Sequence, residues 1–394
     1  MEKKKYSINV KIAILIAAWI TMASDMVITP ILGNIMGAFP NVSPAWSAMA
    51  YNIAGFAFIA ASLVTPYLCR KFTKRSLMLV CSVIAILTGG FGGIVANINY
   101  IIILHLIEGL AAGVCTNLIP SFIVDISSND DEVVKLNSLN GVFGTVAGFI
   151  CSSLAGVVAT KYGWQSAYYI FFLGFLVFVW MLIFLPKTAL EKAEEKSTEK
   201  IKVNGRTILW AIEVFIFSWL INIFWTFIST AIEETGVGSA DVAGVTLSLV
   251  TVTSFVGGFL MIPFSKYLKN FAMHACIVFW VAALVIVLSA QSAALYYVAG
   301  LLWGIGQGVA FPYMYAKASL VARKGTETVA ICLTTIGWYL GVGVTSILYA
   351  PIAAAFHTDS ALFALKVELI GFVIYAVLAT IRALSERKAD RPVG

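Results

Sequence analysis

The chain has 394 residues, of which 60% are hydrophobic and 12% are charged, and its mean hydropathy is +0.92. A soluble domain of this size cannot bury so much apolar surface, whereas lipid can replace water around a bundle of helices. The net charge of +6 does not indicate a nucleic-acid partner, because the basic residues fall where the orientation rule of membrane proteins places them. We therefore predict an all-α polytopic membrane protein.

Twelve apolar stretches are each long enough to cross a bilayer, which takes about 20 residues. In chain order they are 10–39, 46–68, 76–96, 100–124, 138–160, 167–185, 207–232, 242–264, 272–290, 293–316, 330–356 and 361–384. The first is too long for a cleaved signal peptide and contains Asp25, so we expect it to remain as an anchor. The segment between the sixth and seventh spans is rich in Lys and Glu, which predicts three parts: a bundle in 1–185, a cytoplasmic linker in 186–206 and a bundle in 207–394.

Lysine and arginine are distributed asymmetrically around these spans. Of the 26 basic residues, 24 lie in the termini, in the linker or in the loops that alternate on one side. Lys161 falls in a loop on the other side, and Lys366 falls inside the last span. The positive-inside rule then places both termini in the cytoplasm, and it predicts a multi-pass protein of the cell membrane, plasma or inner.

The two halves of the chain repeat each other weakly. Three pairs share nearly one spacing: 109–114 with 304–309 (304 − 109 = 195), 71–74 with 266–269 (266 − 71 = 195), and Gly141 with Gly337 (337 − 141 = 196). Any one match could arise by chance among apolar helices, but three in one register indicate an internal repeat. Parallel halves around a site at the middle of the membrane are typical of transporters.

The basic loop after the second span reads Pro-Tyr-Leu-Cys-Arg-Lys-Phe-Thr-Lys-Arg over 66–75. Together with the length, the twelve spans and the linker, it resembles the major facilitator superfamily, whose loop signature is Gly-x-Leu-Ala-Asp-Arg-x-Gly-Arg-Lys. Leu68 and the basic residues match, but Arg70 stands where the family has Asp, and both glycines are absent. The resemblance implies two pseudo-symmetric six-helix bundles, alternating access and a monomer, and the replaced Asp implies an altered cytoplasmic latch.

Two antiporter signatures of that family are present only in part. The fourth span has His105-Leu-Ile-Glu108-Gly109 in place of Arg-x-x-Gln-Gly. The fifth has Gly144-Thr-Val-Ala-Gly-Phe149 in place of Gly-x-x-x-Gly-Pro. No subfamily is therefore assigned.

Acidic residues inside spans are candidates for proton coupling. Asp25 lies about 15 residues, or roughly 22 Å, into the first span, and Glu108 lies about 8 residues into the fourth. Because ionisable groups at depth are costly, they are functional candidates by default, and His105 shares a face with Glu108. The alternative is a structural hydrogen bond to a neighbouring helix. No metal site or cofactor is expected, since no further ligand pair accompanies His105 and Glu108.

Polar and aromatic residues mark a candidate substrate site. The resemblance implies a cavity lined by the first, fourth, seventh and tenth spans, and the seventh and tenth contain Asn222, Trp225, Trp303, Gln307 and Tyr313. Secondary candidates lie on the second and eleventh spans: Asn52, Trp338 and Tyr339. No arginine lies in the middle of a span, so the site favours a neutral or cationic, partly apolar solute over an anion. The alternative, which we prefer for the serines and threonines of these spans, is that small polar residues help helices to pack.

Opposite charges in two cytoplasmic loops form a candidate gate. Arg70, Lys71, Lys74 and Arg75 would face Asp125, Asp130, Asp131 and Glu132 when the inner side is closed. The alternative is a solvated loop whose ion pairs contribute little to stability.

These observations predict a secondary active transporter that is coupled to protons. Its partners would be a small solute, protons and the lipid bilayer, and export is preferred over uptake of a nutrient or organic acid. An alternative of another class is a membrane sensor or assembly partner that does not transport. An enzyme is not expected, because no nucleophile–base motif, phosphate-binding glycine loop or metal cluster is found in the sequence.

Overall fold

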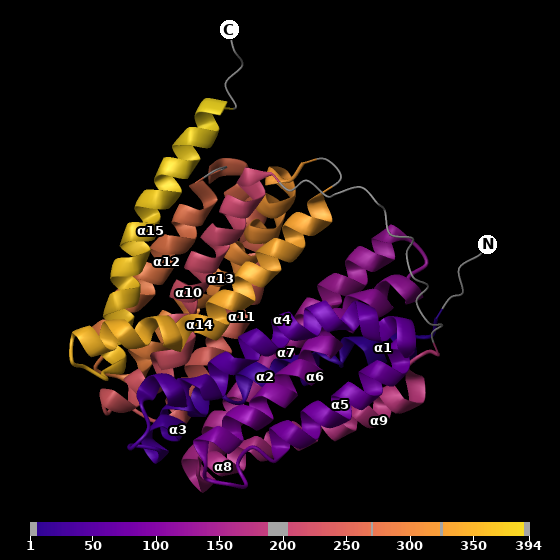
Figure 1. The fold of residues 1–394 in the computed structure, drawn as a ribbon, viewed down its shortest axis with the longest axis horizontal. Helices are drawn as coiled ribbons and strands as arrows, with labels where there is room; N and C mark the ends of the chain where they lie inside the picture. The colour runs from indigo at the N-terminus through magenta and orange to yellow at the C-terminus, as the bar shows by residue number, and fades with distance from the viewer. Residues whose placement is uncertain (1–5, 188–203, 269–270, 324–325, 390–394) are drawn as a thin grey trace. The chain divides into compact units, whose positions relative to one another are not determined.

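The computed structural model describes residues 6–187, 204–268, 271–323 and 326–389, and these residues are almost entirely helical (Figure 1). Ten helical stretches among them are long and apolar enough to cross a membrane. Two further helices, α5 (Lys74–Gly90) and α12 (Ala272–Leu288), have 17 residues each and occupy the predicted third and ninth spans. A helix of that length covers about 26 Å. The predicted all-α, multi-pass fold is confirmed.

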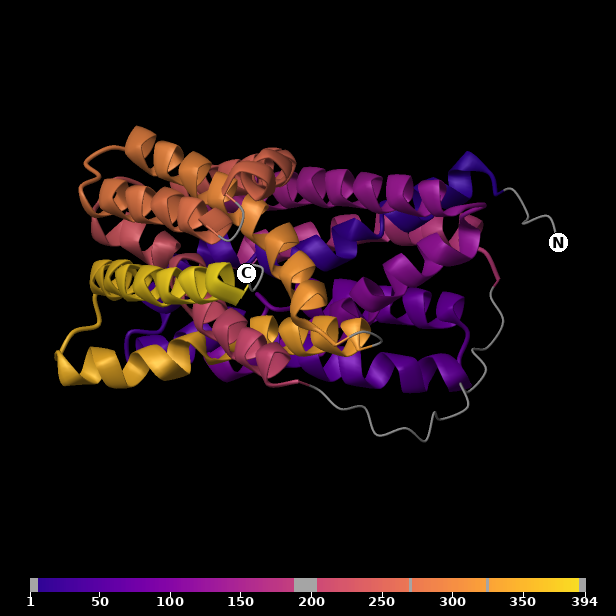
Figure 2. The same ribbon diagram turned by 90° about the horizontal axis from the view of Figure 1, so that it is seen from above.

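The chain divides into two compact units, Met1–Glu199 and Lys200–Gly394. Most of the predicted linker, 186–206, lies outside the described residues. Besides α5, the first unit contains α1 (Ile8–Leu15), α2 (Ala18–Met26), η1 (Thr29–Ile31), α3 (Leu32–Ala38), α4 (Pro44–Lys71), α6 (Ile98–Ile126), α7 (Asp130–Tyr162), α8 (Trp164–Ala167), η2 (Tyr168–Leu173) and α9 (Gly174–Phe184). Besides α12, the second unit contains α10 (Gly205–Glu234), α11 (Ala240–Leu268), α13 (Ala293–Val321), α14 (Glu327–Ala355) and α15 (Ala361–Ala389). Within each unit the long helices run roughly alongside one another (Figure 2).

The first predicted span is not one continuous helix. It breaks into α1, α2, the short 3-10 helix η1 and α3. Pro30 explains the break after α2, since proline has no N–H to donate and its ring clashes with the preceding turn. The hydroxyl of Thr29 donates a hydrogen bond of 2.6 Å to the backbone carbonyl of Asp25. Asp25 therefore lies in the last turn before an interruption in the middle of the span.

In the first unit, two glycines explain why α6 packs closely on α4. A Cβ atom at Gly109 would lie 2.9 Å from Cβ of Ala57, and one at Gly113 would lie 2.7 Å from Cβ of Ala61. Real Cβ contacts are longer than this, so larger residues at these positions would force the helices apart.

In the second unit, Gly304 and Gly308 are the repeat counterparts of Gly109 and Gly113, and they let α13 approach α11 closely. A Cβ at Gly308 would lie 1.9 Å from the backbone oxygen of Ser254. The third pair in the repeat differs between the units: Gly141 has nothing within 4 Å of a built Cβ among the residues described, whereas one at Gly337 would meet the backbone of α10. Two of the three repeated glycine positions therefore mark equivalent helix contacts.

The N-terminal end of α15 is held by a side chain of α10. Glu234 accepts hydrogen bonds from the hydroxyl of Ser360 and from the backbone N–H groups of Ala361, at 2.8 Å, and Leu362, at 3.2 Å. These N–H groups have no partner within their own helix, and a carboxylate also suits the positive end of the helix dipole. We call this contact the first clamp.

A second clamp joins the same two helices near their other ends. Arg382 of α15 forms an ion pair with Glu213 of α10, and the Tyr375 hydroxyl donates a hydrogen bond of 2.9 Å to the same carboxylate. The guanidinium group also lies over the ring of Trp210, 5.0 Å from its centre. The pair is partly buried, with side-chain exposures of 16% and 20%.

We expect Arg382→Gln and Glu213→Gln each to lower the free energy of unfolding by about 1.5–3 kcal/mol, the range for hydrogen bonds to charged groups. Because both variants remove the same contact, the double variant should lose clearly less than the sum of the two. Unfolding of the four proteins in detergent measures this coupling. Additive losses would show that Arg382 and Glu213 stabilise the unit through separate contacts and not through their ion pair.

Candidate functional site

In the first unit, a hydrogen bond joins the broken span to the fourth span. The hydroxyl of Ser24 in α2 donates to Oε2 of Glu108 in α6 over 2.6 Å. Both side chains are buried, with exposures of 1% and 0%. The close contact of Gly109 with α4, one residue along the chain, fixes the position of this part of α6. The arrangement places an acid in the core of a helical bundle, where a carboxyl group can bind and release a proton only if its surroundings change.

Three polar atoms near this bond have no hydrogen-bond partner among the described residues. They are Oε1 of Glu108, Nε2 of His105 and the hydroxyl oxygen of Tyr168. The His105 and Tyr168 rings meet edge to face with 5.9 Å between their centres, and both residues are at most 1% exposed. Because buried polar groups normally find a partner, this cluster has unused capacity for water or for a polar group of a solute.

Asp25 lies within electrostatic range of both Glu108 and Tyr51. It is more exposed than Glu108, since its burial is intermediate. The structure therefore brings Asp25, Glu108 and His105 into one region of the first unit, and Asn52 is fully buried on α4, one residue after Tyr51.

In the second unit, the predicted polar residues of α10 and α13 meet directly. The indole Nε1 of Trp225 donates to the side-chain oxygen of Gln307 over 3.2 Å. Asn222, three residues earlier on α10, donates to the backbone oxygen of Ser218 over 2.8 Å. Ser218 in turn donates to the backbone oxygen of Trp338 over 2.6 Å. Helix α10 therefore meets α13 through the side chains of two predicted substrate residues, Trp225 and Gln307, and it meets α14 through the backbone of a third, Trp338.

Trp303 and Tyr313 occupy different surroundings on α13. Trp303 is 0% exposed and stacks on Phe224 with 3.9 Å between ring centres, so it forms part of the core. Tyr313 is 8% exposed and meets Trp210 edge to face. On α14, Trp338 packs against Phe311, while its neighbour Tyr339 has intermediate burial. These aromatic residues share one unit, but Trp303 is enclosed by other side chains.

Two basic residues of the predicted gate, Lys74 and Arg75, form hydrogen bonds within the first unit. Lys74 donates to the carboxylate of Asp125 over 2.8 Å, which is one of the predicted oppositely charged contacts. Arg75 donates instead to the backbone oxygen of Leu182 in α9 over 2.6 Å. Arg70 and Lys71 are exposed at the end of α4, and the side chain of Asp130 is outside the part of the structure that is described.

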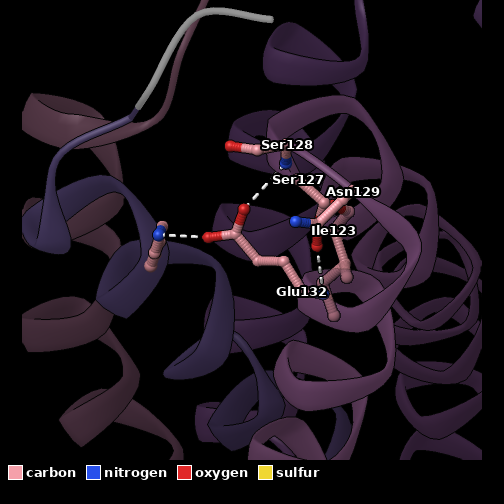
Figure 3. Close-up of polar contacts among 6 residues, drawn as sticks. Ile123, Ser127, Ser128, Asn129 and Glu132 are labelled. Atoms are coloured by element: carbon pink, nitrogen blue, oxygen red, sulfur yellow. Dashed lines mark hydrogen bonds and ion pairs between the residues drawn. The ribbon is translucent and has the colours of Figure 1, made fainter.

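Glu132 connects the start of α7 to α1, as Figure 3 shows. Its carboxylate pairs with Lys11 and accepts a hydrogen bond of 2.7 Å from the N–H of Ser128. The Asn129 side chain accepts from the N–H of Glu132 over 2.9 Å and so caps the N-terminus of α7, while the Glu132 carboxylate reaches the N–H of Ser128, one residue before the cap. Sequence reasoning assigned Glu132 to the gate and missed the cap, although Asn followed three residues later by Glu is its signature.

A depression of about 420 Å³ lies beside this contact, and Asp131 and Lys135 are among the residues that line it. Asp131, a predicted gate residue, is exposed there. The depression mixes acidic and basic side chains, is open on one side, and lies at the end of the unit that we predict to face the cytoplasm.

Sequence reasoning also underestimated Glu368, which it placed near the outer end of the last span, in reach of water. The structure shows it 0% exposed on α15, with neither carboxylate oxygen hydrogen-bonded to any described residue. Glu368 lies seven residues from the N-terminal end of α15, and the face of the helix that it occupies could not be predicted, because the neighbours of α15 were unknown.

Bundles of long apolar helices closed by matched glycine pairs, with buried acids inside them, define a polytopic membrane protein with a transporter architecture. The sequence profile of the Major Facilitator Superfamily matches residues 14–346, and the chain belongs to this superfamily. The family predicted from the loop and the span pattern is thereby confirmed. No curated protein matches the chain by sequence.

Solved transporters share the fold at low sequence identity. The nucleoside transporter NupG aligns over 95% of this chain and 99% of its own, with a TM-score of 0.74 and 14% identity. A D-xylose-proton symporter aligns over 95% and 97%, with 0.73 and 13%. The POT family transporter PepTSo aligns over 96% and 98%, with 0.76 and 12%. At such identities the structural similarity shows the fold alone. The shared fold and the family membership together identify this protein as a secondary transporter.

Proposed function

We propose that this transporter couples solute movement to protons at Glu108 and Asp25. The observation that carries the proposal is the Ser24–Glu108 hydrogen bond, which holds a fully buried acid of α6 against α2. Asp25 follows Ser24 directly, in the last turn before the break in the first span. A charge on a carboxyl group that is buried this deeply is costly, and Asp25 adds a like charge nearby, so we propose that at least one of the two acids carries a proton. Movement of α2 relative to α6 would expose this proton to water.

We propose that the solute is small, neutral or cationic, and partly apolar. Trp225 and Gln307 offer an aromatic face and an amide, and Asn222 lies one turn from Trp225. Arg382, which lies near the end of the last span, is already paired with Glu213, so it does not offer a free charge to an anion. Stacking, cation–π contact and a few hydrogen bonds would then hold the solute.

For the direction of transport we keep export, with proton-coupled uptake as the alternative. Both termini would lie in the cytoplasm, in the plasma or inner membrane, and the protein would act as a monomer. The membrane sensor remains the alternative of another class. A transport assay separates all three, because export and uptake couple opposite solute movements to the proton gradient, and a sensor moves neither solute nor protons.

The test begins with a thermal-shift screen of the purified protein against neutral, cationic and anionic compounds. Compounds that stabilise the protein are then added to proteoliposomes that contain a pH-sensitive dye. We expect neutral or cationic hits to stabilise the protein and to move protons, and Gln307→Leu to weaken that stabilisation. Hits that bind without moving protons would contradict proton coupling, and stabilisation by anions alone would contradict the proposed solute class. No hits and no proton flux would favour the sensor.

A further inference from the structure

The second unit contains a buried acid that the proposed function does not use. Glu368 lies seven residues into α15, about 10 Å from its N-terminal end. It is 0% exposed, and both of its carboxylate oxygens lack a hydrogen-bond partner among the described residues. An intramembrane ionisable residue is expensive even when it is paired, so an unpaired one is a functional candidate.

Aromatic side chains pack together one turn beyond this position on α15. Phe372, one turn further along the same face of α15, lies 5.2 Å from Trp280 and 6.1 Å from Trp303, measured between ring centres. The backbone of Phe224 in α10 is a polar neighbour of the carboxyl group, and the Phe224 ring stacks on Trp303. The indole nitrogen of Trp303 likewise has no hydrogen-bond partner within the described chain. The carboxyl group therefore has a backbone neighbour and no hydrogen bond of normal geometry, which is fewer donors than a charged acid needs.

The ionisable groups on the neighbouring helices are engaged elsewhere. On α10, the acids of the first and second clamps bind the two ends of α15. On α12, His274 hydrogen-bonds to Thr380 of α15, which lies twelve residues beyond Glu368, or roughly 18 Å along the helix. The Cys276 thiol donates to a backbone carbonyl of its own helix. On α13, Tyr296 shares a hydrogen bond with the end of α10, and Lys366 on α15 itself is exposed. No described cation is thus in place to neutralise Glu368.

We propose that Glu368 is a second proton-binding site of this protein, separate from Glu108, and that it is present here as the neutral acid. An unpaired carboxylate is costly to bury, so Glu368 gives up its proton only when α15 moves away from α10 and water can accept the proton. That movement disturbs the stack of Phe224 on Trp303. Phe224 directly precedes Trp225, and Trp303 lies one turn before Gln307. A shift of the stacked rings on proton release therefore also displaces the Trp225–Gln307 hydrogen bond.

The test follows the protonated carboxyl group itself and needs no knowledge of the solute. Infrared spectra of the purified protein in lipid, recorded over a series of rising pH, report the carbonyl stretch of neutral acids. At neutral pH we expect a component that is absent in Glu368→Gln and retained in Glu108→Gln, and that disappears as the pH rises. Hydrogen exchange of the amides of α15, recorded in parallel, should then become several-fold faster in the wild type than in Glu368→Gln at the same pH. Comparison at equal pH removes the intrinsic pH dependence of exchange.

Absence of this component from the wild type at neutral pH would overturn the proposal, as would equal exchange in the wild type and Glu368→Gln over the whole series. If the glutamine variant does not fold, Glu368→Asp provides the second test, because it keeps the acid and should shift the component without removing it. The inference is independent of the proposed function: loss of the Glu108 role would leave the Glu368 component in place, and loss of the Glu368 component would leave proton-driven transport intact.

Discussion

Glu108→Gln is expected to abolish proton-driven transport while solute binding and solute exchange persist. Glutamine preserves the size of the side chain and can still accept the hydrogen bond from Ser24, but it cannot bind and release a proton. Accumulation of solute against its gradient in proteoliposomes should therefore fall to background, and counterflow exchange should continue. The pH dependence of solute-induced thermal stabilisation should be lost as well.

Two further variants make this result specific. Asp359→Asn removes an exposed acid from the loop before α15 and should leave transport unchanged. Asp25→Asn tests the second acid of the proposed site, and loss of coupling in only one of the two site variants would assign the proton to that residue. Wild-type pH dependence in both Glu108→Gln and Asp25→Asn would refute the proton site in the first unit.

Gly308→Ala is expected to destabilise the second unit markedly. Its new Cβ atom would lie 1.9 Å from the backbone oxygen of Ser254, which cannot turn aside as a flexible side chain could. Helices α11 and α13 would have to separate, at a cost of about 1–3 kcal/mol, and this outweighs the gain of up to about 1 kcal/mol that alanine brings over glycine in a helix. Thermal unfolding in detergent should show a clear fall in Tm.

Gly258→Ala is the matched control on the same pair of helices. There the nearest atom to a new Cβ is the backbone oxygen of Gly308 at 3.9 Å, an ordinary contact distance. We expect its Tm to stay the same or to rise slightly, because only the helix propensity changes. An equal fall in both variants would mean that glycine is required for a reason other than the close approach at Gly308.

The spans, their order and the family could be predicted from sequence because the bilayer fixes the length of an apolar helix. The repeat was visible for the same kind of reason, since only glycine fits where two helices nearly touch, as at Gly109 and Gly304. Pro30 gave a local signal for the break in the first span, but a uniform apolar pattern over 10–39 concealed it. Features that depend on neighbouring residues, such as span length and close-contact glycines, could therefore largely be predicted from the sequence.

The contacts between distant helices could not be predicted. Apolar periodicity is weak when all faces of a helix are apolar, so it does not show which face of α15 carries Glu368 inward. The pairing of Glu213 with Arg382 likewise depends on α10 and α15 being neighbours, which no single span reveals. Of the candidate site, the acids and amides were recognised by type and depth, whereas Ser24 as the partner of Glu108 required the structure.

The two clamps lie at matched positions on antiparallel helices. Glu213 and Glu234 are 21 residues apart on α10 (234 − 213), and Ala361 and Arg382 are 21 residues apart on α15 (382 − 361). Each interval corresponds to roughly 32 Å of helix. Two contacts so far apart oppose sliding of α10 along α15, because sliding would have to break both of them. Separation of the two helices between the contacts would require one helix to bend, and Glu368 lies in that interval of α15.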